Sequence, residues 1–402
     1  MTLPPAAITG VGAVTPLGVG ADVLHERWVQ GVSGLEDGKG VCRDFDPGEL
    51  LTKKQARRTD RFVQFGLAAC KEATEAAWGG ELPYPPERVA CLLGVSFGGT
   101  QVLFDQYQVL QESGPAAVWP LTVPVTMPNA TPAVLAMTHG FHGESRSIAS
   151  ACASSAQAIG EGLRMLRLGD ADAVIVGGTE ACLTEFLMAA FRTAGALSRS
   201  GICRPFDRRR DGFVMAEGAG ILILEDPEKA DERGAEVLGY VSGYGSTTDG
   251  HHLTAPAEDG QTCALAIRTA LKDAGRTPED VDVVNAHGTS TQANDLAETN
   301  ALKVALGDHA YKIPISAPKS VVGHSIGAAG AVEAITALLA LRNREVAPTV
   351  GLEEPEEELD LNYVPGGAIP LERANGNGDG RLVCLSNSFA FGGHNAVVVI
   401  EA

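Results

Sequence analysis

Short apolar runs alternate with longer helical patterns along the whole chain, and this alternation limits the possible folds more than any other feature. The apolar runs are rich in β-branched residues, as buried strands are. They cover residues 6–12, 88–96, 171–178, 220–226, 280–288 and 381–391. Apolar residues recur at helical spacing over residues 60–78, 152–168, 262–274, 294–306 and 326–342. The alternation predicts an α/β fold.

Two stretches of the chain share one order of elements, which indicates an internal duplication. Residues 68–100 and 266–291 each contain a helical pattern, a Pro-Glu-x-Val sequence, an apolar strand and a loop with Gly and Thr. A strand of small residues and a helix follow in each case. If the stretches are structural repeats, the helix that starts near Cys152 faces the helix that starts near His324 across a pseudo-twofold axis.

The length and composition fit two such units around a large core. The chain has 402 residues, of which 45% are hydrophobic and 20% charged. A new strand-like run starts near residue 237. We therefore expect an N-terminal half over residues 1–237 and a C-terminal half over residues 238–402.

The charge and the N-terminal sequence argue against several classes of function. A formal net charge of −19 disfavours a nucleic-acid-binding surface, which needs clustered basic residues. The first residues lack the pattern of a secretory signal, so we expect a cytoplasmic protein. The apolar residues 326–341 contain Glu333 and are too short to span a bilayer, so we expect a buried helix and no membrane association. The eight cysteines are never closer than 21 positions, which favours reduced thiols over a metal site or a disulfide framework.

One of these cysteines, Cys152, lies where small residues give way to a helical pattern. A thiol at the first turn of a helix is exposed to unpaired backbone N–H groups and to the positive end of the helix dipole, which lower its pKa toward neutrality. The neighbouring Ala and Ser side chains leave room for an acyl group, and the following N–H groups can hold an oxyanion. We interpret Cys152 as a nucleophile, with a packed core cysteine as the alternative.

Two histidines follow predicted strands in the second half of the chain. His287 lies in "NAHGTST", and His324 lies in "APKSVVGHSIGAAG" five residues after Lys319. Histidines beside glycines can donate hydrogen bonds to one carbonyl oxygen of a ligand close to the backbone. A structural role for each histidine is the alternative, and their spacing does not resemble a metal site.

A different nucleophile is also possible from the sequence. The residues "GVSFG" (94–98) follow an apolar strand and match the G-x-S-x-G elbow of α/β-hydrolases. On that interpretation Ser96 would carry a hydrolase reaction.

Seven motifs that occur in a fixed order make the chain resemble one family of condensing enzymes. It is similar over essentially its whole length to the elongating β-ketoacyl-acyl carrier protein synthases, or ketosynthases, of type II fatty-acid and polyketide systems. The resemblance implies a thiolase-like α/β fold in which two pseudo-twofold-related halves form α-β-α-β-α layers. The motifs are "ITGVGAVTPLG", "SACASS", "GGTEA", "RPFDRRRDGFVMAEGAG", "NAHGTSTQAND", "APKSVVGHSIGAAGAVE" and "NSFAFGGHN".

The resemblance implies the roles of three residues in a decarboxylative condensation. Cys152 matches the nucleophile that accepts the acyl chain. His287 and His324 match the two histidines that hold the thioester carbonyl of the malonyl extender while it loses carbon dioxide. The enolate carbon then attacks the acyl group on Cys152. The second histidine distinguishes elongating enzymes from relatives that have an asparagine there and prime from coenzyme A.

Five further residues match supporting positions of the family. Lys319 matches a lysine that supports the histidine pair electrostatically, and Glu333 matches the buried acid behind it. Phe391 matches a gating aromatic residue whose backbone N–H completes the oxyanion hole. Thr289 and Thr291 match threonines near the pantetheine arm and the malonyl group.

The resemblance also implies partners. Substrates would arrive on the phosphopantetheine arm of an acyl carrier protein, without a tightly bound cofactor. Because carrier proteins are acidic, we expect docking on the basic segment 51–62, chiefly at Lys54, Arg57 and Arg58; a solvated helix face is the alternative. The family forms dimers, so the chain pairs with itself or with a chain-length factor. A non-catalytic role like that of a chain-length factor is the alternative function, although such partners typically lack the cysteine.

The chain departs from the usual family motifs at three positions that bear on substrate range. Ala153 follows the nucleophile where Ser or Thr is frequent. "APKS" stands where "STKS" is usual, and His394 occupies a position where Thr is common.

Overall fold

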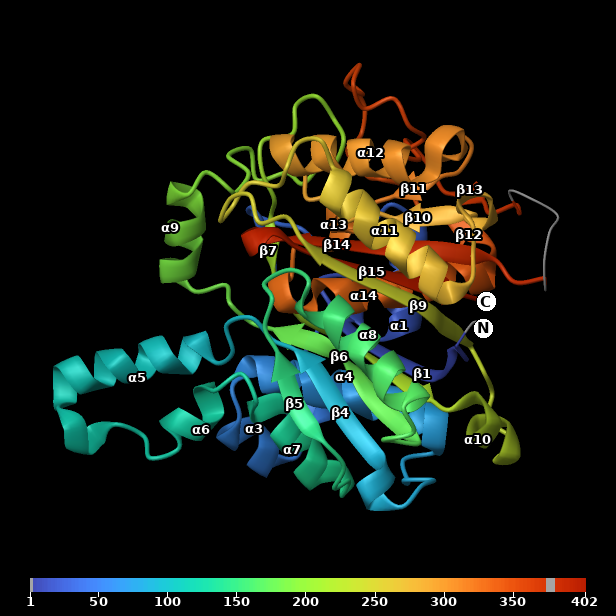
Figure 1. Cartoon of the computed structure of the whole chain (residues 1–402). Coiled ribbons are helices and arrows are strands. Elements are labelled where there is room, and N and C mark those ends of the chain that lie inside the picture. The colour runs from blue at the N-terminus through green and yellow to red at the C-terminus, as the bar shows by residue number, and fades with distance from the viewer. Residues whose placement is uncertain (1–2, 374–379) are drawn as a thin grey trace.

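The computed structural model describes residues 3–373 and 380–402, and its main element is one long mixed sheet (Figure 1). Strand β2 (Gly18–Val19) pairs with β1 beside the main path. The strands along the path are, in spatial order, β11 (Ile315–Ser316), β10 (Val283–Asn285), β14 (Val383–Ala390), β15 (His394–Glu401), β9 (Gly239–Thr248), β1 (Ala6–Thr15), β8 (Gly218–Glu225), β6 (Ala173–Glu180), β4 (Val89–Gly94) and β5 (Ser145–Ile148).

The strand order is the same in both directions from the central antiparallel pair of β1 and β9. On one side, β8 and β6 follow β1 in antiparallel pairings, and β4 and β5 follow in parallel pairings. On the other side, β15 and β14 follow β9 in antiparallel pairings, and β10 and β11 follow in parallel pairings. The predicted pair of related halves is therefore confirmed. Strand β9 begins two residues after the expected boundary at residue 237, and the boundary itself stays a prediction.

Helices cover both faces of this sheet and form three layers (Figure 1). The helices α4 and α7 lie outside the first half, α11 and α12 lie outside the second, and α8 and α14 lie between the halves in contact with each other. The result is the expected order α-β-α-β-α. The bounds are α4 (Arg61–Trp78), α7 (Ala130–His139), α8 (Ser154–Arg167), α11 (Gln261–Ala274), α12 (Gln292–Leu306) and α14 (Ala329–Asn343).

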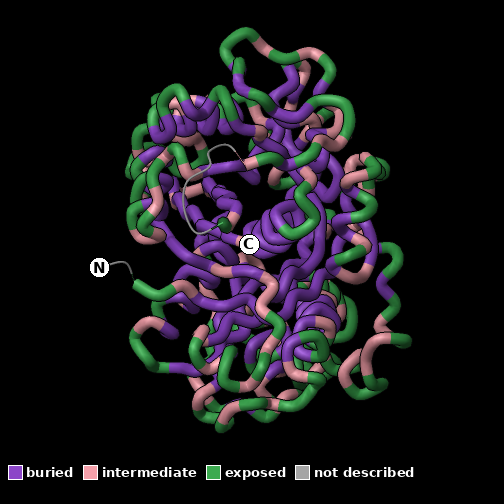
Figure 2. Tube along the Cα trace, turned by 90° about the vertical axis from the view of Figure 1, so that its right-hand side faces the viewer, coloured by how far each residue is buried: buried purple, intermediate pink, exposed green. Residues whose placement is uncertain are grey.

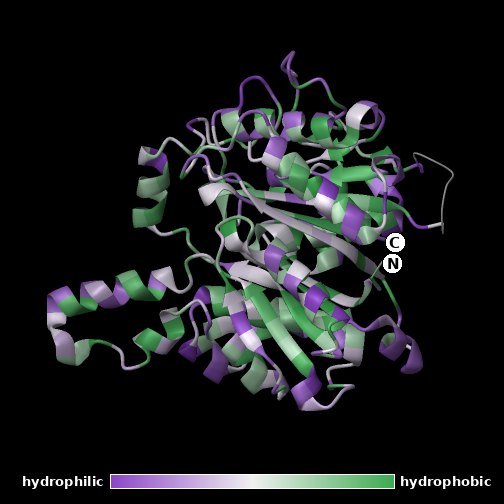
Figure 3. Cartoon of the chain, viewed as in Figure 1, coloured by the Kyte–Doolittle hydropathy of each residue, from purple (hydrophilic) through white to green (hydrophobic). Residues whose placement is uncertain are grey.

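Strands β4, β6 and β8 are buried on both faces, which explains their apolar sequences, whereas the edge strand β5 is partly exposed. In β6, Val174 and Val176 face the middle helices, whereas Ala173 and Ile175 face the outer layer with α4. The same alternation of period two divides the residues of β8, β14 and β15 between two packed clusters. Figure 2 shows the buried interior, and Figure 3 shows that β4 is hydrophobic whereas the long strand β9 is close to neutral.

Helix α14 confirms the prediction of a buried helix. Within the described residues, Ile326–Asn343 is the one helical stretch that is long and apolar enough to cross a membrane, but 89% of it is buried inside the protein. Small residues let α14 approach α8 closely: a Cβ added at Gly330 would lie 2.9 Å from the backbone nitrogen of Ala156. The stretch is therefore a core helix of the middle layer.

Two insertions extend from the first half (Figure 1). Helices α5 (Thr100–Ser113) and α6 (Thr122–Thr126) form an arm, and α9 (Glu185–Thr193) lies apart from the layers. The smaller elements are α1 (Ala21–Val29), α2 (Pro47–Leu50), α3 (Lys53–Arg58), α10 (Pro227–Glu232), α13 (Lys319–Val322), β3 (Lys39–Gly40), β7 (Met215–Ala216), β12 (Glu345–Val346) and β13 (Ile369–Pro370).

An ion-pair clasp joins the two halves at the surface. Arg208 pairs with Glu354, Arg209 pairs with Glu353 at 3.0 Å, and the buried Arg210 pairs with Glu356. The three arginines belong to the first half and the three glutamates to the second. The clasp thus holds the segment 208–210 of the first half to the segment 353–356 of the second.

Candidate active site

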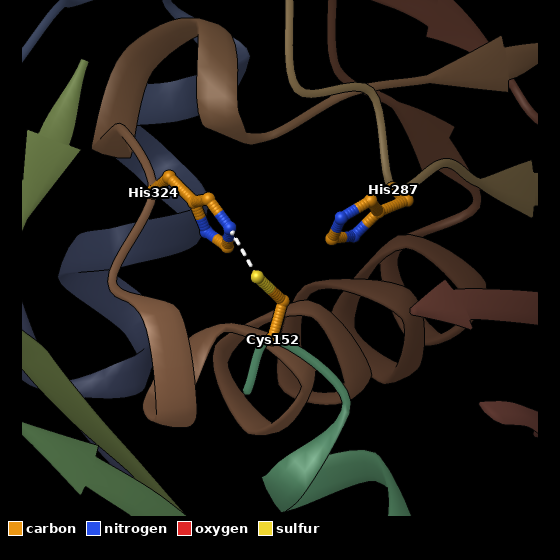
Figure 4. A group of neighbouring side chains, drawn as sticks. All are labelled: Cys152, His287 and His324. Atoms are coloured by element: carbon orange, nitrogen blue, oxygen red, sulfur yellow. Dashed lines mark hydrogen bonds between the residues drawn. The ribbon is translucent and has the colours of Figure 1, made fainter. Parts of the chain in front are cut away.

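The loops after the parallel strands of both halves meet at one cavity of about 530 Å³. Parallel strands that share an edge direct the loops at their carboxyl ends to the same side of a sheet. Cys152 comes from the loop between β5 and α8, His287 from the loop after β10, and His324 from the loop after α13. All three side chains line the cavity (Figure 4).

Cys152 and His324 are in direct contact, as the predicted duplication requires. The Nε2 atom of His324 lies 2.9 Å from the Sγ atom of Cys152 (Figure 4). The ring of His287 is perpendicular to that of His324, at 86° and with 5.5 Å between the ring centroids. These three residues can therefore act on one bound group.

Lys319 and Glu333 lie directly behind the histidines. The Lys319 ammonium is fully buried, donates to the backbone carbonyl of His287 over 2.6 Å and contacts the carboxylate of Glu333. Its Nζ atom is also 3.2 Å from Nδ1 of His287. Because an ammonium only donates, Nδ1 is the acceptor, and the ring proton of His287 is on Nε2, the nitrogen left for the cavity.

Both imidazoles are uncharged at neutral pH. Burial, together with the positive charge of Lys319, holds the pKa of His287 and of His324 well below the usual value of 6.5. A neutral His287 keeps its Nε2–H as a hydrogen-bond donor, and its side chain is buried from solvent. This state suits stabilisation of negative charge on a substrate oxygen.

The prediction of a lowered pKa for Cys152 is wrong. Burial raises the pKa of the Cys152 thiol to about 12, although Lys319 and the backbone N–H groups of Phe391 and of Cys152 itself act in the opposite direction. The first turn of α8 is shielded from water, so desolvation of the thiolate outweighs the helix dipole. Cys152 therefore rests as a thiol, and Nε2 of His324 is within reach of its proton.

Phe391 closes the cavity from the turn between β14 and β15. Its backbone N–H points to the sulfur of Cys152, and its ring is 6.4 Å from the ring of Phe191. The adjacent Gly392 donates its N–H to the carbonyl of Leu253 over 2.7 Å. The turn is therefore tied to the loop around residue 253, which also lines the cavity near its mouth.

Thr289 and Thr291 line the same cavity after His287. Their hydroxyls are 2.9 Å apart, and Thr291 caps α12 by accepting a hydrogen bond from the backbone N–H of Asn294. The cap fixes the orientation of the loop from which both threonines line the cavity.

The basic segment has its own helix, α3, away from the cavity. A capping box between Thr52 and Gln55 starts this helix. Lys54, Arg57 and Arg58 are exposed, and in the described part of the chain no hydrogen bond or ion pair involves them. Arg61, at the end of the same segment, instead pairs with Glu217 at 2.7 Å and stabilises the fold.

The contacts of the Ser96 hydroxyl indicate a structural role. Its hydroxyl donates to the carbonyl oxygen of Ala151 over 2.9 Å and lies 3.3 Å from the hydroxyl of Ser154. Among the described residues, no histidine contacts this hydroxyl. The arrangement lacks the base that a serine hydrolase requires.

The cavity holds a set of potential metal ligands as well. The ligand atoms of Cys152, His287 and His324 lie within 4.8 Å of one another, and zinc accepts this combination of donors. The adjacent ammonium of Lys319 opposes the binding of a cation. The expected absence of a resident metal stays a prediction.

Two buried carboxylates beside the site were missed by the sequence analysis. Glu298 accepts the backbone N–H groups of His287 and Gly288, each over 2.8 Å. Glu180 accepts the N–H of Ser96 over 2.8 Å. One signal was available for Glu180, because an acidic residue directly after a mostly apolar run is unusual and requires a buried partner.

Comparisons with known proteins cover nearly the whole chain. Residues 41–230 match "Beta-ketoacyl synthase, N-terminal domain", and residues 238–353 match "Beta-ketoacyl synthase, C-terminal domain". A 3-oxoacyl-[acyl-carrier-protein] synthase 2 of Synechocystis sp. is 41% identical over 98% of this chain and 97% of the relative. The enzyme of the same name from Staphylococcus aureus strain COL is 38% identical, with the same two coverages.

Solved structures agree with these relatives in fold. The ishigamide ketosynthase/chain length factor has a TM-score of 0.91 and 30% identity, and it covers 100% of this chain and 99% of that one. A β-ketoacyl synthase from Burkholderia phymatum STM815 has a TM-score of 0.87 and 30% identity over the same shares. A type II polyketide ketosynthase in complex with its acyl carrier protein has a TM-score of 0.89 and 28% identity, again over the same shares. The predicted thiolase-like fold is confirmed, and the chain belongs to the β-ketoacyl synthase family.

Proposed function

We propose that this β-ketoacyl synthase takes an acyl chain onto Cys152 and extends it with a malonyl unit delivered by an acyl carrier protein. The enzyme is an acyltransferase that forms a carbon–carbon bond. One observation supports the assignment of these residues: one thiol and two uncharged imidazoles lie together in one buried cavity. The Sγ atom of Cys152 is 2.9 Å from the Nε2 atom of His324.

The acyl transfer step uses the contact between Cys152 and His324. The thiol proton passes to Nε2 of His324 as the sulfur attacks the thioester carbonyl of the incoming acyl chain. The backbone N–H groups of Cys152 and Phe391, which already point to the sulfur, stabilise the oxyanion. The carbon–sulfur bond to the carrier breaks, and the carrier thiol leaves with the proton.

The condensation step uses both histidines. The thioester oxygen of the malonyl unit accepts a hydrogen bond from Nε2–H of His287 and one from His324, whose ring proton is on Nδ1 during acyl transfer and moves to Nε2 for this step. The two donors stabilise the enolate that forms when carbon dioxide leaves. Lys319 holds Nδ1 of His287 as an acceptor, so Nε2 donates to this oxygen. The enolate carbon then attacks the acyl carbonyl, the carbon–carbon bond forms, and the bond to Cys152 breaks. The thiolate that leaves takes up a proton from solvent, which regenerates the thiol.

Mass spectrometry of the intact protein with acyl-loaded carrier tests the nucleophile. We expect a covalent acyl adduct on the unchanged protein and on Ser96→Ala, and no adduct on Cys152→Ala. An adduct that persists in Cys152→Ala and disappears in Ser96→Ala would instead favour a hydrolase. A protein that never acquires an acyl group would favour a non-catalytic, chain-length-factor-like role.

The carrier and subunit partners are proposals that rest on chemistry and on relatives. The exposed cations Lys54, Arg57 and Arg58 of α3 offer an acidic carrier a docking surface on an otherwise negative protein. The titles of two similar structures name an acyl carrier protein and a chain length factor. We propose that this chain binds a carrier through α3 and works as a homodimer or beside a chain-length factor in a type II fatty-acid or polyketide synthase.

A further inference from the structure

Glu180 is a buried carboxylate at the end of β6 that takes no part in the mechanism above. Its side chain is fully buried. It accepts the backbone N–H of Ser96 over 2.8 Å and that of Phe97 over 3.2 Å, and the N–H groups of Gly98 and Gly327 also bond to it. Within the part of the chain that the structure describes, the hydrogen-bond partners of this carboxylate are backbone N–H groups. Burial of a carboxylate that is not paired with a cation costs free energy of folding, so a residue of this kind is expected to have a specific role for its neighbours.

One set of contacts leads from Glu180 to the nucleophile. Glu180 fixes the backbone of Ser96, and the Ser96 hydroxyl donates to the carbonyl oxygen of Ala151 over 2.9 Å. Ala151 directly precedes Cys152 and has a φ of +49°, a left-handed conformation that an alanine rarely adopts. Such strain persists only where surrounding groups hold it, and the Ser96 hydroxyl is one of those groups.

A second set of contacts leads from Glu180 to the base. The N–H of Gly327 bonds to the carboxylate, and Gly327 follows His324 by three residues. Ile326, between them, lines the cavity with a φ of +46°, which is unusual for a β-branched residue. A Cβ added at Gly327 would lie 2.7 Å from both the Glu180 carboxylate and the Ser96 nitrogen, so only glycine allows this approach.

We propose that Glu180 is a positioning residue that holds Cys152 and His324 at the separation needed for transfer of the thiol proton. The Glu180 carboxylate accepts hydrogen bonds both from the loop that fixes Ala151 and from the turn that follows His324. The two strained residues flank the reacting pair from opposite halves of the molecule, and this one carboxylate restrains both segments. The inference rests on the proposed function, because it concerns the acyl transfer step.

The ionised form of Glu180 is the one that fits these contacts. A carboxylate accepts all the surrounding N–H groups, whereas a carboxylic acid would direct one proton at a donor. Burial raises the pKa of Glu180 to about 7 against the effect of these N–H groups. The titratable groups nearby are the thiols of Cys152 and Cys182, whose pKa values are raised by burial, and the carboxylate of Glu217. We expect proton transfer from Cys152 to become faster as the pH rises through about 7.

Ionisation of Glu180 has the opposite effect on stability. Its pKa is higher in the folded protein than the ordinary value of 4.5, so the folded state binds more protons than the unfolded state between these two values. The resulting contribution to stability is present below pH 4.5 and is lost as the pH rises through about 7. At pH 8 the Glu180→Gln protein loses one acceptor for these N–H groups but no longer buries a charge. Because these two effects oppose each other, we expect it to keep its thermal midpoint at pH 8.

The test compares Glu180→Gln with a matched control, Glu225→Gln. Glu225 is equally buried, but it lies at the far end of the pairing between β6 and β8 and is bound to Arg233 at 2.6 Å. Three measurements are made on each protein from pH 6 to 9. They are the single-turnover rate of acyl transfer from a carrier to Cys152, the rate of alkylation of Cys152 by iodoacetamide followed by peptide mass mapping, and the thermal midpoint.

For Glu180→Gln we expect both rates at pH 8 to fall about tenfold or more, with an unchanged KM for the carrier, an unchanged thermal midpoint and no rise in rate through pH 7. For Glu225→Gln we expect a lower midpoint with both rates and the pH profile retained. A Glu180→Asp protein should be slow but should keep the rise in rate with pH.

Two results would overturn the inference. One is a Glu180→Gln protein with the rates and pH profile of the unchanged protein. The other is a loss of rate in Glu180→Gln that only follows a loss of thermal stability like that of Glu225→Gln. The proposed function fails separately: in that case the unchanged protein is not acylated on Cys152, while the alkylation rates still report on Glu180.

Discussion

The two halves of the molecule share a topology but contribute different chemistry to the cavity. In the first half, the loop after β4 carries Ser96, and Glu180 binds its backbone. In the second half, the equivalent loop after β10 carries His287, and Glu298 binds its backbone. In the proposed mechanism the first half supplies the nucleophile, and the second half supplies the groups that stabilise an enolate. A duplicated scaffold with a buried carboxylate under each loop can therefore serve two steps that are separable by mutation.

The largest expected effect separates the two steps directly. His287→Ala removes one of two hydrogen-bond donors to the enolate oxygen, so we expect decarboxylation of malonyl-loaded carrier to fall about 10²- to 10³-fold. Acylation of Cys152 should continue, since His324 still contacts the sulfur. The release of carbon dioxide and the mass of the intact protein measure the two steps. Equal loss of both steps would show that the halves do not act separately.

The carboxylates beneath the two loops offer a sharper comparison. Glu298→Gln disturbs the backbone of His287 and Gly288, so we expect decarboxylation to slow about tenfold while acylation of Cys152 changes little. Glu180→Gln should slow acylation. Single-turnover assays of both steps on both variants provide the test, and the same pattern in the two variants would contradict the assignment.

A smaller effect is expected at the surface of the first half. Charge reversal in Arg57→Glu with Arg58→Glu should raise the KM for the carrier about fivefold and leave kcat unchanged, because these exposed residues guide association rather than chemistry. The effect should weaken at high salt. Lys272→Glu on α11, an exposed lysine of the second half, is the control and should not change KM. An unchanged KM in the double variant would remove α3 as the docking surface.

The smallest expected effect concerns the protonation state of Cys152, from the first half, and His324, from the second, before substrate binds. Burial raises the pKa of the Cys152 thiol to about 12 and lowers the pKa of the His324 ring, so the pair stays uncharged from pH 6 to 9. The difference in absorbance at 240 nm between the unchanged protein and Cys152→Ala should then show no thiolate in this range. A step near pH 7 would indicate a thiolate–imidazolium pair instead.

The sequence predicted the sheet and the middle layer well because these parts bury both faces. The apolar runs at 171–178 and 220–226 lie within two residues of β6 and β8. The first half also showed its helices clearly, and α4 begins one residue after the predicted position. By contrast, β5 was predicted only as a strand of small residues without bounds, and the arm of α5 and α6 was not predicted. The strand β5 reads "SRSI" and lies at a sheet edge, and the arm is amphipathic at most, so neither carries a strong periodic signal.

The sequence predicted which residues lie in the candidate site, but it did not predict the pKa of the Cys152 thiol. The motifs brought Cys152, His287 and His324 to attention, and the structure places their ligand atoms together. The lowered thiol pKa was wrong because the depth of α8 below the surface is a property of the assembled layers, which local sequence does not contain. Glu180 was missed for the same reason, because its partner Ser96 is 84 positions away in the sequence. Glu298 is only 11 positions from His287, but its role depends on the fold of the loop between them.

The middle layer has a consequence for any attempt to study the halves as independent proteins. Helices α8 and α14 fill the space between the halves, so each half uses a helix of the other as a wall of its interior. Cutting the gene between the codons for Glu232 and Gly239 would give two polypeptides that each expose an uncovered apolar face in solution. Such fragments should aggregate when made singly and should regain activity only when they are produced together.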